Sequence, residues 1–130
     1  MARSFRQLAL AAARAAADKK GENVAVLHAG RRSPIADYLV IATALSRPHL
    51  EALENEVEKA AAELRFRCLR RSTPKSDFWR VLDFGGLIVH LMLAETRAFY
   101  ALEKLHDGAP RLRFEDRAPR RPAARGPRAR

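Results

Sequence analysis

Apolar and polar residues alternate along this chain with two different periods, which divide it into helices and strands. Apolar residues recur every three or four positions after Ser4 and again after Ser46, and this spacing predicts two amphipathic helices. Ser4 precedes Gln7 at the spacing of a helix capping box, and Gly21 is the expected terminator of the first helix. The second helix carries its apolar stripe on Leu50, Leu53, Val57, Ala60, Ala61 and Leu64.

The other side of the second predicted helix is acidic. Its carboxylates are Glu51, Glu54, Glu58 and Glu63. Paired carboxylates can serve metal binding or acid–base chemistry, but this spacing along one helix face is typical of a solvated surface. We therefore expect these side chains to face water.

Strand-sized apolar segments fill most of the remaining sequence. They span residues 23–28, 37–43, 66–71, 78–84 and 87–93, and a last helix is expected from Glu95 to about His106, with Ala98, Leu102 and Leu105 facing inward. Segment 37–43 is apolar on both faces, which indicates a central strand in a covered sheet. The order of elements predicts a single α/β (α+β) domain with a mixed five-stranded sheet flanked by helices.

The last two predicted strands form a hairpin around Gly85-Gly86, because two-residue glycine turns accept the positive φ that such a connection requires. Trp79 then pairs with Met92, Val81 with His90, and Asp83 with Ile88. One face holds Phe78, Leu82, Phe84, Leu87, Val89, Leu91 and Leu93, so it is the expected core face. Arg80 is its polar exception and is expected to reach water.

The opposite face of the hairpin mixes apolar and polar side chains. It carries Trp79, Val81, Asp83, Ile88, His90 and Met92. Tryptophan and methionine are enriched at the centres of protein interfaces, which favours a docking surface. A helix that covers this face, with His90 as a hydrogen-bonded core histidine, explains the composition equally well.

Charge and composition change near residue 110. The whole chain has a formal net charge of +10 over 130 residues, and residues 111–130 hold eight arginines against Glu115 and Asp116. We interpret 1–109 as the folded domain and 110–130 as a disordered Arg/Pro-rich tail. Its arginines are candidates for RNA contact, although they could serve only to solubilise the protein: Arg111, Arg113, Arg117, Arg120, Arg121, Arg125, Arg128 and Arg130.

The sequence argues against an enzyme. No serine or cysteine nucleophile is placed beside Asp83 and His90, the four histidines show no metal-ligand spacing with Cys68, and phosphate-binding glycine motifs are missing. We therefore expect no metal or other cofactor. The single Cys68 is expected to be a buried structural thiol in a reducing, cytoplasmic setting. No apolar run approaches the ~20 residues of a membrane span, and the N-terminal segment is interpreted as a helix of the fold rather than a targeting peptide.

Two segments resemble the Iojap-related ribosomal silencing factors. Residues 33–43, SPIADYLVIAT, resemble the family's S-x-I-A-D-Y-F-V-I-A segment. A second signature, a tryptophan followed by L-D-[YF]-G-D-hydrophobic-V-V-H and E-x-R-x-[FY]-Y-x-L-E, is matched at Trp79, Leu82, Asp83, Phe84, Gly85, Val89, His90, Glu95, Arg97, Phe99, Tyr100, Leu102 and Glu103. Two departures are Gly86, where the family has aspartate, and the tail beyond Pro110, which lies outside the family core.

The resemblance implies a nucleotidyltransferase-like fold without catalytic residues. It implies binding to the large ribosomal subunit through large-subunit ribosomal protein fourteen, which blocks joining with the small subunit and represses translation, and a homodimer when free. The implied binding residues are Trp79 as anchor, Val81, Ile88 and Met92 around it, Asp83, His90, Glu95 and Arg97 as orienting groups, and Tyr100 at the border. Alternatives are a large-subunit assembly factor, a general RNA-binding module or, less so, a nucleotidyltransferase-like enzyme.

Overall fold

The computed structural model describes residues 4–30, 36–72, 75–106 and 108–115. Its helices are α1 (Phe5–Asp18), α2 (Arg47–Glu63), α3 (Ala94–Tyr100) and α4 (Leu102–Leu105). Its strands are β1 (Glu22–His28), β2 (Tyr38–Ala44), β3 (Arg70–Arg71), β4 (Trp79–Asp83), β5 (Leu87–Leu93) and β6 (Arg111–Leu112). Residues 33–35 of the first resembling segment lie outside the described ranges.

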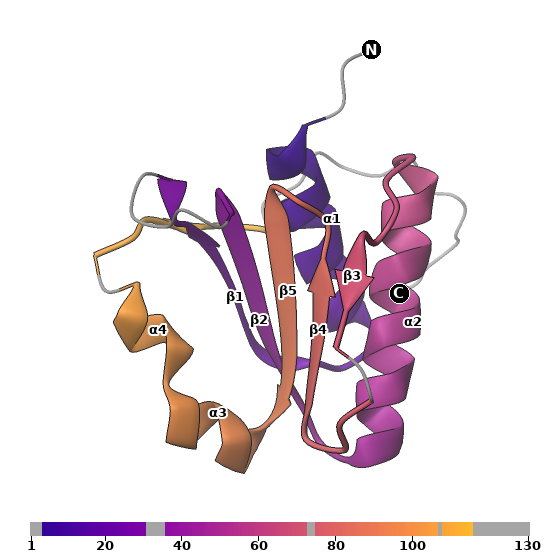
Figure 1. Ribbon diagram of the computed structural model, residues 1–130, viewed down its shortest axis with the longest axis vertical. Helices are drawn as coiled ribbons and strands as arrows, with labels where there is room; N and C mark the ends of the chain where they lie inside the picture. Colours follow the sequence, from indigo (N-terminus) through magenta and orange to yellow (C-terminus); the bar gives the residue numbers. More distant parts are fainter. Residues whose placement is uncertain (1–3, 31–35, 73–74, 107, 116–130) are drawn as a thin grey trace.

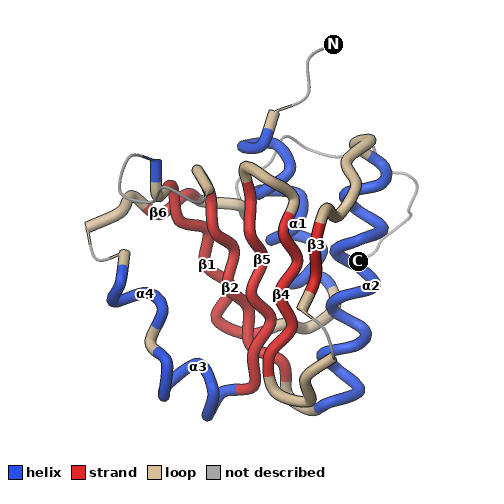
Figure 2. The backbone as a smooth tube through the Cα atoms, viewed as in Figure 1, coloured by secondary structure: helices blue, strands red, loops and turns tan. Residues whose placement is uncertain are grey.

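One mixed sheet organises the described fold, and helices lie on both of its sides (Figures 1 and 2). The strand order is β3-β4-β5-β2-β1-β6, with β2 and β5 parallel and the other neighbours antiparallel. The predicted α/β class and mixed sheet are confirmed, with six strands instead of five. The central position of β2, between β1 and β5, agrees with its apolar sequence.

The main core lies between the sheet and the two long helices. Leu8 and the alanines of α1 pack with Leu50 and Leu53 of α2 against one sheet face, where Leu82 and Val89 point inward. A smaller cluster on the other face comprises Leu27, Ala29, Leu39, Ile41 and Met92, with Trp79 and Leu102 packed against it. Since alternate residues of one strand enter the two clusters, the period-2 pattern correctly predicted both faces of β5.

Both long helices begin at the predicted serines. Ser4 Oγ accepts a hydrogen bond from the backbone N–H of Gln7 at 3.1 Å, and Ser46 Oγ accepts one from His49 at 3.2 Å. The end of α1 differs from the expectation, because Lys20 takes the left-handed φ of 72°. Gly21 is needed for close approach instead: a Cβ there would lie 2.9 Å from the carbonyl oxygen of Ala16.

The acidic face of α2 was wrongly expected to be entirely solvated. Glu54 is only 2% exposed, and its Oε1 accepts a hydrogen bond from Arg80 Nη1 at 2.6 Å. Arg80 also donates to Glu51 Oε1 at 2.9 Å and is itself only 4% exposed, so it does not reach water. The hydrogen bond from Arg80, followed by one from Lys75, lowers the pKa of Glu51. A buried ion pair therefore joins α2 to β4.

The last predicted helix is broken into two short helices. Ala101 adopts the left-handed conformation, with φ 47° and ψ 52°, between α3 and α4. Neither helix has a buried residue, and of the three residues expected to face inward only Leu102 packs against the sheet, while Ala98 and Leu105 are exposed. The break lets the chain turn back toward the sheet after Tyr100.

The two ends of the sheet also differ from expectation. β3 includes only Arg70–Arg71 of the strand predicted over 66–71. At the other edge, β6 pairs Leu112 with Val26 of β1, and Phe114 is 8% exposed in the main core. The expected domain boundary at residue 110 therefore differs from the structure, in which the fold continues to at least Phe114. Residues 116–130 of the predicted tail lie outside the described ranges.

Candidate protein-docking surface

The β4–β5 hairpin positions the predicted site, and its register matches the sequence-based pairing. Trp79 is opposite Met92, Val81 opposite His90, and Asp83 opposite Ile88. The turn requires glycine because Gly85 has a φ of +100°. Asp83 Oδ1 accepts the Gly85 backbone N–H at 2.8 Å, so this carboxylate stabilises the turn.

The neighbouring Gly86 lies beneath an aromatic ring. A Cβ at this position would fall 2.4 Å from the ring of Phe5, which packs over the turn from the start of α1. The aspartate that the resembling family carries here would displace that ring. The departure at Gly86 is thus matched by local packing.

Trp79 is held by two neighbours. Its indole Nε1 donates a hydrogen bond to His90 Nδ1 at 3.0 Å, and its ring centroid lies 4.7 Å from that of Tyr100. An accepting Nδ1 requires the neutral imidazole with its proton on Nε2. Burial, with a smaller contribution from the charge of His106, lowers the pKa of His90 to about 4, which keeps the imidazole neutral at physiological pH.

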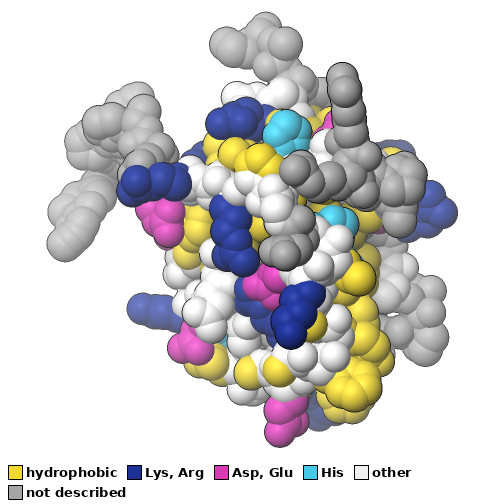
Figure 3. Space-filling view, turned by 90° about the vertical axis from the view of Figure 1, so that its left-hand side faces the viewer, with side chains coloured by type: hydrophobic (Ala, Val, Ile, Leu, Met, Phe, Trp, Pro, Cys, Tyr) yellow, Lys and Arg dark blue, Asp and Glu magenta, His cyan; other side chains and the backbone are white. Residues whose placement is uncertain are grey.

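Exposed aromatic rings form an open groove of about 470 Å³ beside Trp79. Its lining comprises Ser76, Phe78, Trp79, Glu95, Thr96, Phe99 and Tyr100. Phe99 is 79% exposed, Phe78 60% and Tyr100 50%. Figure 3 shows hydrophobic side chains gathered at the lower right of the side that carries α3 and α4. We call Phe78, Trp79, Phe99 and Tyr100 the aromatic groove.

Phe78 and Phe99 were not among the predicted binding residues. Phe78 was assigned to the core by extending the strand alternation one residue too far. β4 begins at Trp79, and Ser76 Oγ accepts the backbone N–H groups of both Phe78 and Trp79, at 3.0 and 3.2 Å, which turns the chain at this point. Phe99 lies in the resembling segment, and its exposure on α3 could have been inferred only with the helix break known.

The structure places the predicted residues at different depths and positions. Met92 was expected to contact the partner, but it is fully buried with Ile41 and the other apolar residues of the smaller cluster, which leaves no exposed surface on it in this structure. Val81 and Ile88 are half-buried on the same hairpin face. Asp83 lies at the turn, about 13 Å along the strand from Trp79. The mixed face is therefore partly core and partly surface.

Arg97 and Glu95 also differ in exposure, because Arg97 is bonded inside the fold and Glu95 faces the solvent. Arg97 Nη1 donates to Thr43 Oγ1 at 2.9 Å, and its Nη2 pairs with Glu103 Oε2 at 2.5 Å. The hydrogen bond from Arg97 lowers the pKa of Glu103. Arg97 thus fastens α3 and α4 to β2, whereas the exposed Glu95 lines the groove and can reach a partner.

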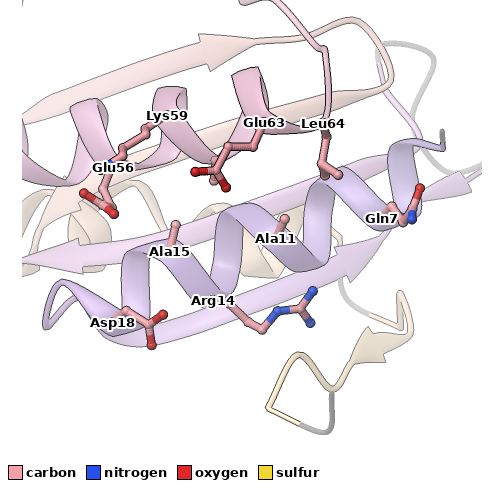
Figure 4. Close-up of a pocket in the computed structure, with 10 residues that line it drawn as sticks. Gln7, Ala11, Arg14, Ala15, Asp18, Glu56, Lys59, Glu63 and Leu64 are labelled. Carbon is pink, nitrogen blue, oxygen red and sulfur yellow. The ribbon is translucent and has the colours of Figure 1, made fainter. Parts of the chain in front are cut away.

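A second depression of about 550 Å³ runs along the seam between α1 and α2 (Figure 4). Ala11, Ala15 and Ala60 line it together with side chains of both charges, among them Arg14 and Glu56. Aromatic rings do not contribute to its lining. This seam lacks the apolar anchors that distinguish the aromatic groove.

Other kinds of site receive no support from the described residues. Among them, no group of three or more His, Cys, Asp and Glu side chains could hold a metal ion. Cys68 is a free, partly buried thiol, and burial raises its pKa, which makes it a poor nucleophile. Within the same ranges, no helix has the length and apolarity to cross a membrane.

The described residues form a mixed α/β domain with an exposed aromatic groove at one end of the β4–β5 hairpin. The chain belongs to the RsfS family, "Ribosomal silencing factor during starvation", whose model matches residues 2–130. It is 33% identical over 112 residues to the ribosomal silencing factor RsfS of Halalkalibacterium halodurans, covering 86% of this chain and 96% of that protein.

Similar proteins occur in other organisms as well. Mouse "Mitochondrial assembly of ribosomal large subunit protein 1" is 32% identical over 90 residues, which cover 67% of this chain and 40% of the mouse protein. A crystal structure of a Chromobacterium violaceum protein superposes with a TM-score of 0.77 at 25% identity, over 82% of this chain and 88% of that one. The family supports a ribosome-associated, regulatory role.

Proposed function

We propose that this protein represses translation by binding the large ribosomal subunit through large-subunit ribosomal protein fourteen and blocking the small subunit sterically. Membership of the RsfS family supports the ribosomal role. The observation that carries the docking site is the aromatic groove, in which Trp79 is fixed between His90 and Tyr100. We also propose that the free protein is a cytoplasmic homodimer.

The groove favours a protein partner because its rings combine large apolar area with restricted motion. A tryptophan held by a hydrogen bond and a ring contact loses little freedom on binding, so most of its apolar burial contributes to affinity. Phe78 and Phe99 enlarge the contact area, and Glu95 at the rim can orient the partner. Val81 and Ile88 would extend the contact along the hairpin. Asp83 would hold the turn and Arg97 would hold α3, so both would position the surface.

Occlusion needs no chemical step. Once the groove is occupied, the remainder of the bound domain fills space that an approaching subunit would require. The bound domain would thus act as a steric block. Its effect would depend on the fraction of large subunits that are occupied, and therefore on affinity and concentration.

We further propose that the C-terminal arginines contact ribosomal RNA. Arg111 is anchored by its backbone in β6, and its exposed side chain lies 3.9 Å from Glu103. Arg113 is exposed as well. Arg117, Arg120, Arg121, Arg125, Arg128 and Arg130 lie outside the described ranges. Phosphate contacts of this kind would add affinity without sequence specificity.

A role in large-subunit assembly is the second candidate. It is favoured by the name of the mouse relative, which refers to assembly of the mitochondrial large subunit. An assembly factor would bind incomplete large subunits better than mature ones. A silencing factor would bind mature subunits and reduce joining.

The test uses Trp79→Ala and Phe99→Ala in the full chain, sedimented with separated ribosomal subunits. Loss of an aromatic anchor should weaken large-subunit binding by about 2 kcal/mol, roughly thirty-fold in Kd. Phe99 is almost fully exposed, so its removal leaves the core unchanged. Leu69→Ala is the matched control, since Leu69 is an exposed apolar residue beyond the other end of β4.

Binding to the large subunit alone, together with reduced subunit joining, is the expected result for the unmodified protein. If folded Trp79→Ala and Phe99→Ala proteins bind large subunits as tightly as the Leu69→Ala control, the groove is not the docking site. Tight binding without any effect on joining would instead favour the assembly role.

A further inference from the structure

A second surface of opposite chemistry lies at the far end of β4 from the aromatic groove. Residues 65–71, RFRCLRR, contain four arginines and no acidic residue. They lead from the end of α2 into β3, the outermost strand on one side of the sheet (Figure 1). β3 pairs Arg70 with Asp83, which is the last residue of β4, whereas Trp79 is the first.

The backbone of this segment is fixed by alternate residues that face the protein. The Phe66 ring packs against Phe5 with centroids 5.1 Å apart, and the Cys68 thiol donates to the carbonyl oxygen of Arg70 at 3.1 Å. The backbone N–H of Leu69 donates to the carbonyl oxygen of Asp83 at 2.8 Å. The intervening side chains therefore project outward from a held backbone.

The outward arginines differ from the other arginines that border the sheet. Arg71, Arg80 and Arg97 each pair with glutamates inside the fold. Arg67 is exposed and makes no hydrogen bond or ion pair with another described residue. Arg70 is 83% exposed in its side chain, and its ion pair with Asp83 is long, at 3.8 Å. These guanidinium groups remain accessible to a ligand.

We propose that Arg67 and Arg70 form a contact site for the phosphate backbone of RNA, separate from the aromatic groove and from the C-terminal tail. The planar guanidinium can donate two hydrogen bonds to one phosphate, which explains the use of arginine at every basic position of the segment. The site reads charge and not sequence. It goes beyond the proposed docking function and does not depend on it.

Protection of the sheet edge is the competing explanation, because charged residues on edge strands prevent pairing between molecules. β3 has only two residues and Arg71 is held by Glu54 and Glu58, so little edge is left to protect. An acidic protein partner is a further alternative. It is less favoured because exposed Leu69 is the one apolar side chain that projects outward with the arginines.

The experiment measures binding of the full chain to a short RNA duplex of unrelated sequence over a series of KCl concentrations. The double variant Arg67→Gln/Arg70→Gln is compared with Arg47→Gln/Lys59→Gln, which removes the same charge from exposed positions on α2. Each lost phosphate contact should reduce the slope of log K against log salt by about 0.9. We expect a reduction of about 1.8 for the first pair and an unchanged slope for the second.

Three outcomes would overturn the proposal. Equal slopes for the two double variants would mean that only net charge matters. Aggregation of Arg67→Gln/Arg70→Gln with an unchanged RNA slope would assign the arginines to edge protection. Loss of binding to an isolated ribosomal protein, with RNA binding retained, would assign them to an acidic protein partner. Trp79→Ala should leave the RNA slope unchanged, so failure of the docking proposal is recognised separately. The difference between the two double variants should also persist in a chain ending at Glu115, which separates this site from the C-terminal tail.

Discussion

At the scale of single residues, His90 determines how Trp79 is presented. Its Nδ1 accepts the indole N–H, and this requires a neutral ring. Protonation would place an N–H opposite another N–H and break the contact. The low pKa of about 4 therefore protects the groove from acidification over most of the physiological range.

The stability of the protein should fall as the pH decreases from about 6.5 to about 4. The unfolded chain has a histidine pKa near 6.5, and the folded one has a pKa of about 4, so in this window the unfolded state binds more protons. The His90 contribution is fully present above pH 6.5 and decreases by up to about 3 kcal/mol toward pH 4. The measurement is the free energy of unfolding in denaturant at several pH values.

His90→Gln is the matched variant for this measurement, because its amide oxygen can still accept a hydrogen bond but does not titrate. Its free energy of unfolding should vary less between pH 6.5 and 4 than that of the unmodified protein. The same pH dependence in both proteins would contradict the assignment to His90.

The sequence correctly predicted which face of the hairpin each of these side chains lies on, but it predicted their burial less well. Alternation along β4 and β5 placed Trp79 and His90 on one face, because that placement depends only on the local backbone. The same alternation could not show that Met92 is covered, since its cover comes from β2 and from the chain around Leu102. Local periodicity assigns a face, whereas burial requires knowledge of what packs on it.

At the scale of elements, α2 is joined to β4 by the buried pair of Glu54 and Arg80. Removing two charges from water is unfavourable, and the short hydrogen bonds among Arg80, Glu54 and Glu51 offset that term. We therefore expect the pair to fix the position of α2 along the sheet more than it increases stability. The sequence marked Arg80 as the polar exception of the core face, but it did not indicate the partner, because Glu54 is 26 residues away and fits the acidic face of α2.

Glu54→Leu alone should lower the free energy of unfolding by about 3 kcal/mol, because it leaves the buried Arg80 with the more exposed Glu51 as its carboxylate partner. The double variant Glu54→Leu/Arg80→Met should recover most of this loss, since it removes both buried charges. Denaturant unfolding of the two variants provides the comparison. A double variant as unstable as Glu54→Leu would show that the pair contributes net stability.

The elements that sequence predicted best are those with local causes. Serine caps begin α1 and α2, and two glycines form the β4–β5 turn. The break at Ala101 has no such marker, because its left-handed conformation follows from contacts of Arg97 and Leu102 with the sheet. Short elements that are held by tertiary contacts show little periodicity in their own sequence, so they are hard to predict.

At the scale of the whole molecule, residues 111–114 extend the sheet beyond β1 and contribute to the core. β6 covers β1, Phe114 enters the main core, and Arg14 Nη1 donates to the Phe114 carbonyl oxygen at 3.2 Å. Composition pointed the other way because arginine and proline dominate this region, and a two-residue strand has no detectable period. The burial of Phe114 in the core keeps residues 111–114 in the fold despite their arginine-rich and proline-rich surroundings.

A chain ending at Pro110 should be less stable than one ending at Glu115 by about 3 kcal/mol, since it loses the buried Phe114 ring and the β6 pairing. Phe114→Ala in the full chain should cause a loss of similar size. Thermal and denaturant unfolding test both. The chain ending at Glu115 should match the full chain, and equal stability of all these proteins would contradict a structural role for the segment.

The hydrogen bond between Trp79 and His90 has a practical consequence. Trp79 is the sole tryptophan of the chain, so the intrinsic fluorescence of the protein originates at the proposed docking surface. Because its N–H is already bonded to His90, a partner that covers the ring changes the polarity around the indole without competing for that proton. Emission from the unlabelled protein should therefore shift to shorter wavelength when the groove is occupied, so the fluorescence of Trp79 can be used to measure binding directly.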